Sequence, residues 1–246
     1  MLTIYFLIPI FFTIFLFNKN NNKNVKNHNT SRCDYDSNFK NTIVISNKYI
    51  KKNIIDIDQE IQFIRWYENV NINEDINIVI NSTGGDISSS DAIINILSLH
   101  KGKINIYIPR IAYSAGTMIA LCADQLYMNN YSLLSLVDPQ IDIGEETYSV
   151  KSFLNLKRNN GIVNLSEDNQ LMFYECKKLY DDNIRNMNKI LKNKYSKRVI
   201  KKIIKEFGEA IYPHEKQFNI NDIKDMEINV KSPVPFYYNN LIKKYF

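Results

Sequence analysis

Two short motifs carry residue types that could do covalent chemistry. The first is residues 81–86, Asn-Ser-Thr-Gly-Gly-Asp, and the second is residues 113–117, Tyr-Ser-Ala-Gly-Thr. Gly84 and Gly85 lack Cβ atoms, so the backbone can turn sharply there and leave its N–H groups open to an anionic oxygen. Ser114 could supply a nucleophilic hydroxyl. Taken singly, a Gly-Gly turn is typical of an ordinary loop and a serine before a helix is typical of a cap.

The surrounding elements predict that both motifs lie at one edge of a sheet. Each motif follows a β-branched apolar run and precedes a segment with helical periodicity. Strands that alternate with helices of this length imply parallel pairing through right-handed crossovers. The carboxyl ends of adjacent parallel strands are where such sheets bind ligands, so an oxyanion donor and a nucleophile would share one crevice. The predicted strands are 42–46, 76–81, 103–108 and 125–128, and the predicted helices are 58–70, 88–99, 114–122, 166–194 and 196–207.

The chain divides into four predicted segments. Residues 1–17 are almost wholly apolar, and about 26 Å of helix at 1.5 Å per residue would just cross a thin hydrocarbon layer. Neither a basic leader nor a small-residue cleavage site supports a signal peptide, and no polar face supports a core helix, so we expect a transmembrane anchor. Residues 18–40 are expected to form an Asn/Lys-rich tether, 41–231 the α/β domain that carries both motifs, and 232–246 a C-terminal tail expected to be a loop. Basic residues follow the apolar run and none precedes it, which predicts a single-pass protein whose body lies on the cytoplasmic side.

Composition narrows the classes of function. The 246 residues are 45% apolar and 23% charged, as in a globular domain, and the net charge is +5. The lysines are scattered instead of gathered with aromatic residues, so nucleic-acid binding is not expected. Three cysteines at wide spacing, Cys33, Cys122 and Cys176, indicate reduced thiols and neither a disulfide framework nor a metal site.

With these residues in view, the chain resembles the serine dehydrogenase proteinase family, whose members are similar to Clp proteases and more distantly to signal peptide peptidase A and crotonases. The resemblance rests on INSTGGD, IPRIAYSAGTMIALCADQLYM and SLVDPQI within residues 76–141, with a weaker match at 211–215. It implies a repeated ββα core with a parallel sheet and C-terminal helices. It also implies a membrane-anchored serine endopeptidase that cleaves polypeptides, needs no cofactor and assembles into a homo-oligomer.

The resemblance assigns Ser114 as nucleophile and the N–H groups of Gly84, Gly85 and Ala115 as the oxyanion hole. A serine needs a positioned base near neutral pH. Clp proteases carry a histidine some two dozen residues after the serine, where this chain has Asp138 instead.

Two assignments of the base stay open. His214 lies where the family carries a histidine, so Ser114, His214 and Asp138 would form a triad with its last two members exchanged along the chain. A Ser-Lys dyad with Lys151 or Lys157 is the competing arrangement. Each residue also has a non-catalytic interpretation: Asp138 as a turn residue, His214 as a surface histidine, and Lys151 and Lys157 as solvated side chains.

Two other functions compete with a peptidase. Gly116, Cys122, Ala123 and Asp124 are also similar to the crotonase helix, which would imply a CoA-thioester enzyme, although the serial glycines of that family are missing. A catalytically degenerate subunit that scaffolds a complex is the third reading, because a fold does not prove activity.

Overall fold

The computed structural model describes residues 41–46, 54–143, 146–159, 166–209, 211–213 and 215–243. The chain separates into two units, Met1–Ser37 and Asn38–Phe246, and every described residue belongs to the second. The predicted anchor at 1–17 and the tether at 18–40 lie outside the described residues. Within the part of the chain that is described, no helix is long and apolar enough to cross a membrane.

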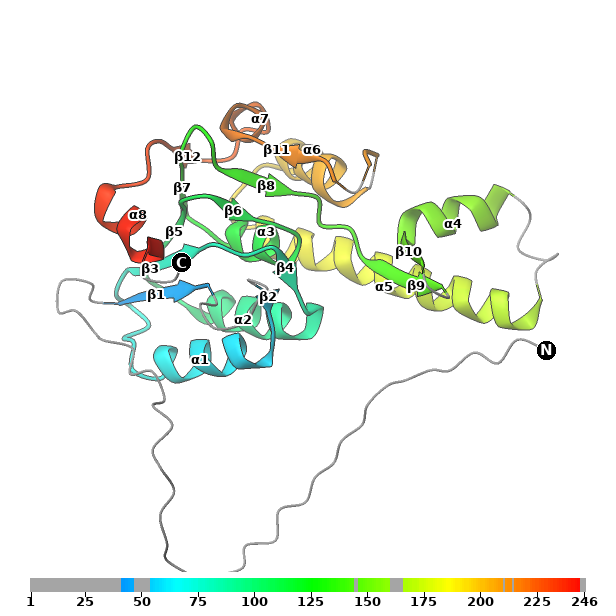
Figure 1. The fold of residues 1–246 in the computed structure, drawn as a ribbon, viewed down its shortest axis with the longest axis horizontal. Helices are drawn as coiled ribbons and strands as arrows, with labels where there is room; N and C mark the ends of the chain where they lie inside the picture. Colours follow the sequence, from blue (N-terminus) through cyan, green and yellow to red (C-terminus); the bar gives the residue numbers. More distant parts are fainter. Residues whose placement is uncertain are drawn as a thin grey trace, which may run out of the picture. The chain divides into compact units, whose positions relative to one another are not determined.

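The central element is a five-stranded sheet in the order β1-β3-β5-β7-β12, and every neighbouring pair in it is parallel (Figure 1). The strands at Thr42–Ile45, Ile76–Ile80 and Ile104–Ile108 are rich in β-branched residues, which favour extended backbone. The predicted α/β fold with a parallel central sheet is confirmed. The strands are β1 (Thr42–Ile45), β3 (Ile76–Ile80), β5 (Ile104–Ile108), β7 (Gln125–Met128) and β12 (Val230–Lys231).

Helices cover both faces of this sheet. Alternate side chains such as Ile78 and Ile106 join a large core with α1 (Ile57–Tyr67), α2 (Ile87–Leu99) and α3 (Ala115–Ala120). On the other face Val79 and Tyr107 pack against α8 (Phe236–Lys243), where the rings of Tyr107 and Tyr238 stack with centroids 3.7 Å apart. The expectation of a loop after residue 231 was therefore wrong for α8, because its apolar side chains are needed to cover this face of the sheet.

Two small sheets extend the carboxyl end of the central sheet. β2 (Ile54–Ile55) pairs with β4 (Gly84–Gly85), and a second sheet has the order β11-β8-β6. The succession β3, β4, α2 is repeated as β5, β6, α3, which is the expected ββα repeat. Strands of the second small sheet are β6 (Ile111–Ala112), β8 (Leu133–Ser135) and β11 (Gln217–Phe218).

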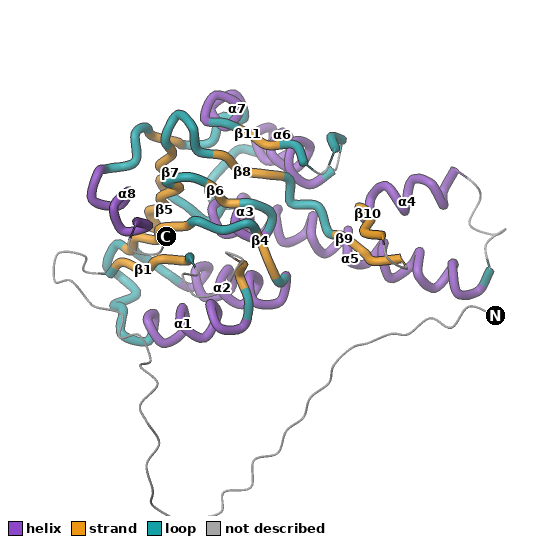
Figure 2. Tube along the Cα trace, in the orientation of Figure 1, coloured by secondary structure: helices purple, strands orange, loops and turns teal. Residues whose placement is uncertain are grey.

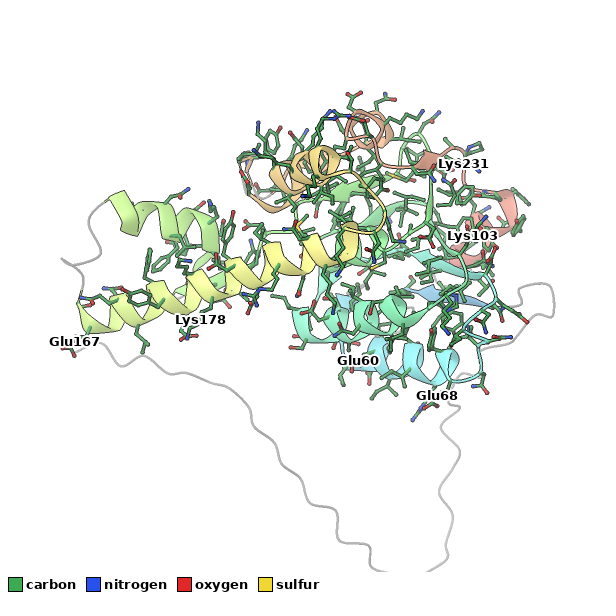
Figure 3. All side chains as sticks on the ribbon, turned by 180° about the vertical axis from the view of Figure 1, so that it is seen from behind. Glu60, Glu68, Lys103, Glu167, Lys178 and Lys231 are labelled. Atoms are coloured by element: carbon green, nitrogen blue, oxygen red, sulfur yellow. The ribbon has the colours of Figure 1, made fainter. Side chains whose placement is uncertain are left out.

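A helical arm leaves the core along α5 (Glu167–Leu191), as Figure 2 shows. The C-terminal half of α5 contributes Met187 and Leu191 to the large core, whereas its N-terminal half packs Phe173 and Cys176 against α4 (Val150–Asn159). An antiparallel hairpin of β9 (Gln140–Ile143) and β10 (Glu146–Ser149) leads into α4. Charged residues cover the outside of α5, including Glu167 and Lys178 in Figure 3. The chain returns to the core through α6 (Lys197–Gly208) and α7 (Ile220–Asp225).

Candidate active site

Ser114 has an unusual backbone conformation. It follows β6 and directly precedes α3, with φ 47° and ψ −111°, a region that side chains with a Cβ rarely adopt. Its side chain makes no capping hydrogen bond, although the residue occupies the N-cap position of α3. The ordinary role of a serine at this place, to cap the helix, is therefore not the role of Ser114.

The glycine turn lies directly against Ser114. A Cβ added to Gly84, whose φ is 107°, would lie 3.0 Å from Ser114 Cβ and 3.2 Å from the carbonyl oxygen of Tyr113. Gly85 has φ 153°, and a Cβ there would lie 2.1 Å from the Ile55 carbonyl oxygen. Both positions thus require glycine, the first for close approach to the serine and the second for the pairing of β4 with β2. The structure brings the two predicted motifs together.

The three N–H groups expected to form an oxyanion hole differ in their partners. The Gly84 N–H already donates to Ser82 Oγ at 3.1 Å. The Asp86 N–H donates to the Ile55 carbonyl, and alternate amides of a parallel strand point to opposite sides, so the Gly85 N–H points away from β2. Ala115 is the first residue of α3, where amides have no intrahelical acceptor. Gly85 and Ala115 are therefore better placed to bind an anionic oxygen than Gly84.

Asp138 is buried in a loop that is anchored on two sides. Its side chain is 4% exposed, and its Oδ1 accepts a hydrogen bond from Ser149 Oγ at 3.1 Å. The preceding Val137 N–H donates to the Phe207 carbonyl at the end of α6. Asn183 of α5 donates from Nδ2 to the Val137 carbonyl at 2.9 Å. A carboxyl group in such a fixed loop is positioned more firmly than a solvated turn residue would be.

His214 lies outside the described residues, but the strand that follows it is described. β11 pairs antiparallel with β8, with Gln217 opposite Ser135, and Ser135 Oγ accepts the N–H of Ser114 at 2.9 Å. The same strand β8 leads within three residues to Asp138. Segments that carry Ser114, Asp138 and Gln217 therefore meet around β8.

The other candidate bases have different surroundings. Lys151 donates from Nζ to Tyr180 Oη at 3.1 Å and lies 4.2 Å from the centroid of that ring, between α4 and α5. The side chain of Lys157 lies outside the described residues. Burial raises the pKa of Tyr113, with a smaller opposing effect of Arg110, so this neighbour of Ser114 stays protonated at neutral pH.

Two further groups are structural. His100 Nε2 lies 2.9 Å from the Glu74 carbonyl oxygen and its Nδ1 lies 3.1 Å from Tyr67 Oη, at the end of α2, before β5 begins. Burial raises the pKa of Cys122 to about 12, which keeps this thiol protonated and unreactive. Among the described residues, no group of three or more His, Cys, Asp or Glu side chains is arranged to hold a metal ion.

The ββα repeats, the parallel sheet and the strained serine at its carboxyl edge define an α/β protein of the ClpP-like type. The sequence model of a protein family, the ClpP-like SDH-type serine proteinases, matches residues 42–246, and the chain belongs to this family. The resemblance inferred from the three motifs is thereby confirmed.

Two relatives come from the archaeon Methanocaldococcus jannaschii. The uncharacterized protein MJ1495 is 28% identical over 170 residues, which cover 69% of this chain and 56% of the relative. The uncharacterized protein MJ0137 is 26% identical over 171 residues, covering 69% of this chain and 58% of the relative. The chain thus spans a little over half of the length of these two proteins.

Proposed function

We propose that the protein is a serine endopeptidase in which Ser114 attacks the carbonyl carbon of a peptide bond. The observation that carries the proposal is the conformation of Ser114, which holds its hydroxyl out of the capping role and against Gly84. Backbone strain of this kind persists where surrounding structure enforces it, and it concentrates at functional sites. Membership of a serine proteinase family supports the same reaction.

In the proposed reaction, Ser114 Oγ forms a bond to the carbonyl carbon while its proton passes to the base. The carbonyl oxygen becomes an oxyanion that accepts the N–H groups of Gly85 and Ala115. Loss of one such donor typically raises the barrier by about 3–4 kcal/mol. Collapse of the intermediate breaks the C–N bond, the amine leaves with the proton from the base, and water then hydrolyses the acyl-enzyme.

We favour His214 as the base and Asp138 as its orienting carboxylate. Support comes from β8, whose Ser135 contacts Ser114 and pairs with Gln217, three residues after His214, while its continuation carries the buried Asp138. The Ser-Lys alternative is less favoured for Lys151, because its ammonium group is engaged by Tyr180. His214→Ala should abolish labelling of Ser114, whereas His100→Ala is the matched control, because His100 binds Glu74 and Tyr67 elsewhere in the fold.

A fluorophosphonate probe tests the nucleophile. The full chain should become labelled on Ser114, and Ser114→Ala should not be labelled although it folds. Hydrolysis of casein by the natural protein, absent in the Ser114→Ala variant, would extend the result to peptide bonds. Absence of labelling together with binding of a CoA thioester would support the crotonase alternative. Absence of both would support a scaffold subunit and refute the proposed reaction.

We also propose that residues 1–17 anchor the protein in a membrane with the body on the cytoplasmic side, and that the protein forms a homo-oligomer. The apolar composition of this segment and the Lys19, Lys23, Lys26 and Arg32 that follow it support the anchor and its orientation. A carbonate-washed membrane fraction should retain the full chain and release a chain without residues 1–17. Glycosylation in microsomes of an acceptor site placed in the body would refute the orientation.

A further inference from the structure

A serine on the neighbouring strand contacts the backbone of the nucleophile. Ser135, the last residue of β8, accepts the Ser114 N–H on its Oγ at 2.9 Å. The same hydroxyl lies 3.1 Å from the carbonyl oxygen of Leu136, to which it donates. Because a hydroxyl has one hydrogen and two lone pairs, this arrangement satisfies its donor and fixes its lone pair toward Ser114. Ser135 therefore contacts Ser114 through the backbone N–H group and not through the nucleophilic oxygen.

Thr117 ties Ser135 to the start of α3. Its buried hydroxyl lies 2.7 Å from the Ala112 carbonyl oxygen and accepts the Ser135 N–H at 3.2 Å. β6 and β8 also pair in parallel, with Ala112 opposite Leu134. Side-chain hydrogen bonds thus join three segments on both sides of Ser114, namely Ala112, the first turn of α3 and the end of β8.

We propose that Ser135 is a positioning residue for the reaction of Ser114, an inference that rests on the proposed function. The dihedral angles of Ser114 set the direction of its Cα–Cβ bond, and a φ of 47° is unfavourable unless neighbouring groups enforce it. Gly84 limits the space on one side of the serine, and the hydroxyl of Ser135 fixes the amide on the other.

The alternative open to an unanchored Ser114 is the ordinary N-cap. In that conformation its Oγ would accept the N–H of Gly116 or Thr117, the second and third residues of α3, as capping serines do. A hydroxyl used in this way points along the helix axis and no longer toward a substrate. Removal of the Ser135 hydroxyl therefore favours an unreactive position of the nucleophile while the fold stays intact.

Ser132 provides a matched control close to the same strand. Its buried Oγ accepts the Asn129 N–H at 2.9 Å and lies 2.6 Å from the Ile108 carbonyl oxygen. It thus also pairs one backbone donor and one backbone acceptor, but it does so away from Ser114. Ser132→Ala and Ser135→Ala remove the same kind of interaction, so only the second should change the reactivity of Ser114.

The test measures the rate of fluorophosphonate labelling of the full chain at several probe concentrations, which separates the maximal rate from the half-saturating concentration. Ser135→Ala should lower the maximal rate about 10- to 100-fold, the cost typical of a misplaced reacting group, and leave the half-saturating concentration unchanged. Ser135→Thr, which keeps the hydroxyl, should restore most of the rate. Ser132→Ala should label at the natural rate.

Four results would overturn the inference. Labelling of Ser135→Ala at the natural rate would show that the hydroxyl does not position Ser114. An equal loss of labelling rate in Ser132→Ala would show that the effect comes from lowered stability of the fold alone. Absence of labelling in the natural protein would refute the proposed function, and the inference with it. A crystal structure of Ser135→Ala in which Ser114 keeps its positive φ would also contradict it, whatever the labelling rate.

Discussion

The strain at Ser114 should be measurable as stability, independently of any activity. Ser114→Gly and Ser114→Ala both remove the hydroxyl, but only glycine tolerates φ 47° and ψ −111°. A residue with a Cβ in such a region is destabilised by about 1–3 kcal/mol. Glycine also makes the unfolded chain more flexible, which offsets about 0.4–1 kcal/mol of the gain. Taking middle values, we expect Ser114→Gly to be more stable than Ser114→Ala by about 1 kcal/mol.

Urea unfolding of the two variants gives this difference directly. Trp66 is the single tryptophan and is 7% exposed, so its fluorescence reports the unfolding of the core. A difference of about 1 kcal/mol corresponds to a shift of about 2–4 °C in Tm for a domain of this size, which calorimetry can confirm. Equal stability of the two variants, or a less stable glycine variant, would refute the claim that Ser114 is held under strain.

Three more predictions concern other parts of the fold. Gly85→Ala should destabilise the protein by about 3 kcal/mol, measured by urea unfolding, and slow probe labelling, because its Cβ would lie 2.1 Å from the Ile55 carbonyl oxygen at a φ that disfavours alanine. Cys122 should resist alkylation by iodoacetamide at about pH 8 in the native protein, as read by mass spectrometry, because burial raises its pKa to about 12. Burial also raises the pKa of Asp91, although the hydrogen bond from Asn186 partly offsets this rise. The protonated Asp91 side chain is therefore favoured in the folded protein, and the stability that it contributes is present below the ordinary pKa of the group and lost as pH rises. Asp91→Asn should therefore stabilise the protein more at about pH 7 than at about pH 4, as measured by urea unfolding.

Each of these predictions has a control or a contradicting result. Gly102→Ala is matched to Gly85→Ala, because its Cβ would lie 2.1 Å from the Glu74 carbonyl oxygen, yet it should leave labelling unchanged. Fast alkylation of native Cys122 would contradict its burial, and the urea-unfolded protein supplies the reference rate. An Asp91→Asn variant whose gain in stability is the same at both pH values would contradict the raised pKa.

The central sheet could be predicted from sequence because its signals are local. Residues 76–80 and 104–108 are short apolar runs rich in isoleucine and bounded by polar residues, and they became β3 and β5. The exact helix starts depend on which of several nearby polar side chains caps the first turn. The helix predicted from residue 58 begins at Ile57, because Asp56 caps it by accepting the N–H groups of Asp58 and Gln59. Asn219 likewise caps α7 by accepting the N–H groups of Asn221 and Asp222.

The long helix α5 was predicted, but the β9–β10 hairpin, α4 and α8 were missed because their apolar positions find partners far along the chain. β9 alternates polar and apolar residues over four positions, but its partner β10 does not, and α4 packs against the N-terminal half of α5 and Ile141 in a small cluster. The tail with its two prolines indicated a loop, whereas Val234, Tyr238 and Ile242 cover the sheet. Sequence periodicity does not reveal such contacts.

In the candidate site, the residue types and their order were sufficient to pair Ser114 with the glycine turn. The N–H of Gly84 was counted as free, although Ser82, two residues earlier, accepts it. Ser135 was not singled out, because nothing in the sequence links it to a serine 21 residues earlier. The base assignment stays a prediction, since His214 lies outside the described residues.

The position of β12 has a consequence for synthesis of the protein. This edge strand joins β7 only after about a hundred further residues, and the bond from Gln125 Nε2 to the Asn229 carbonyl spans 104 positions. At about 5–20 residues per second, a ribosome exposes the free edge of β7 for about 5–20 s before its partner is made. α8 is made later still, so Tyr107 stays uncovered for longer than the edge of β7. A nascent chain of this protein therefore presents an open parallel strand and an aromatic surface, which are features that chaperones bind and that promote aggregation.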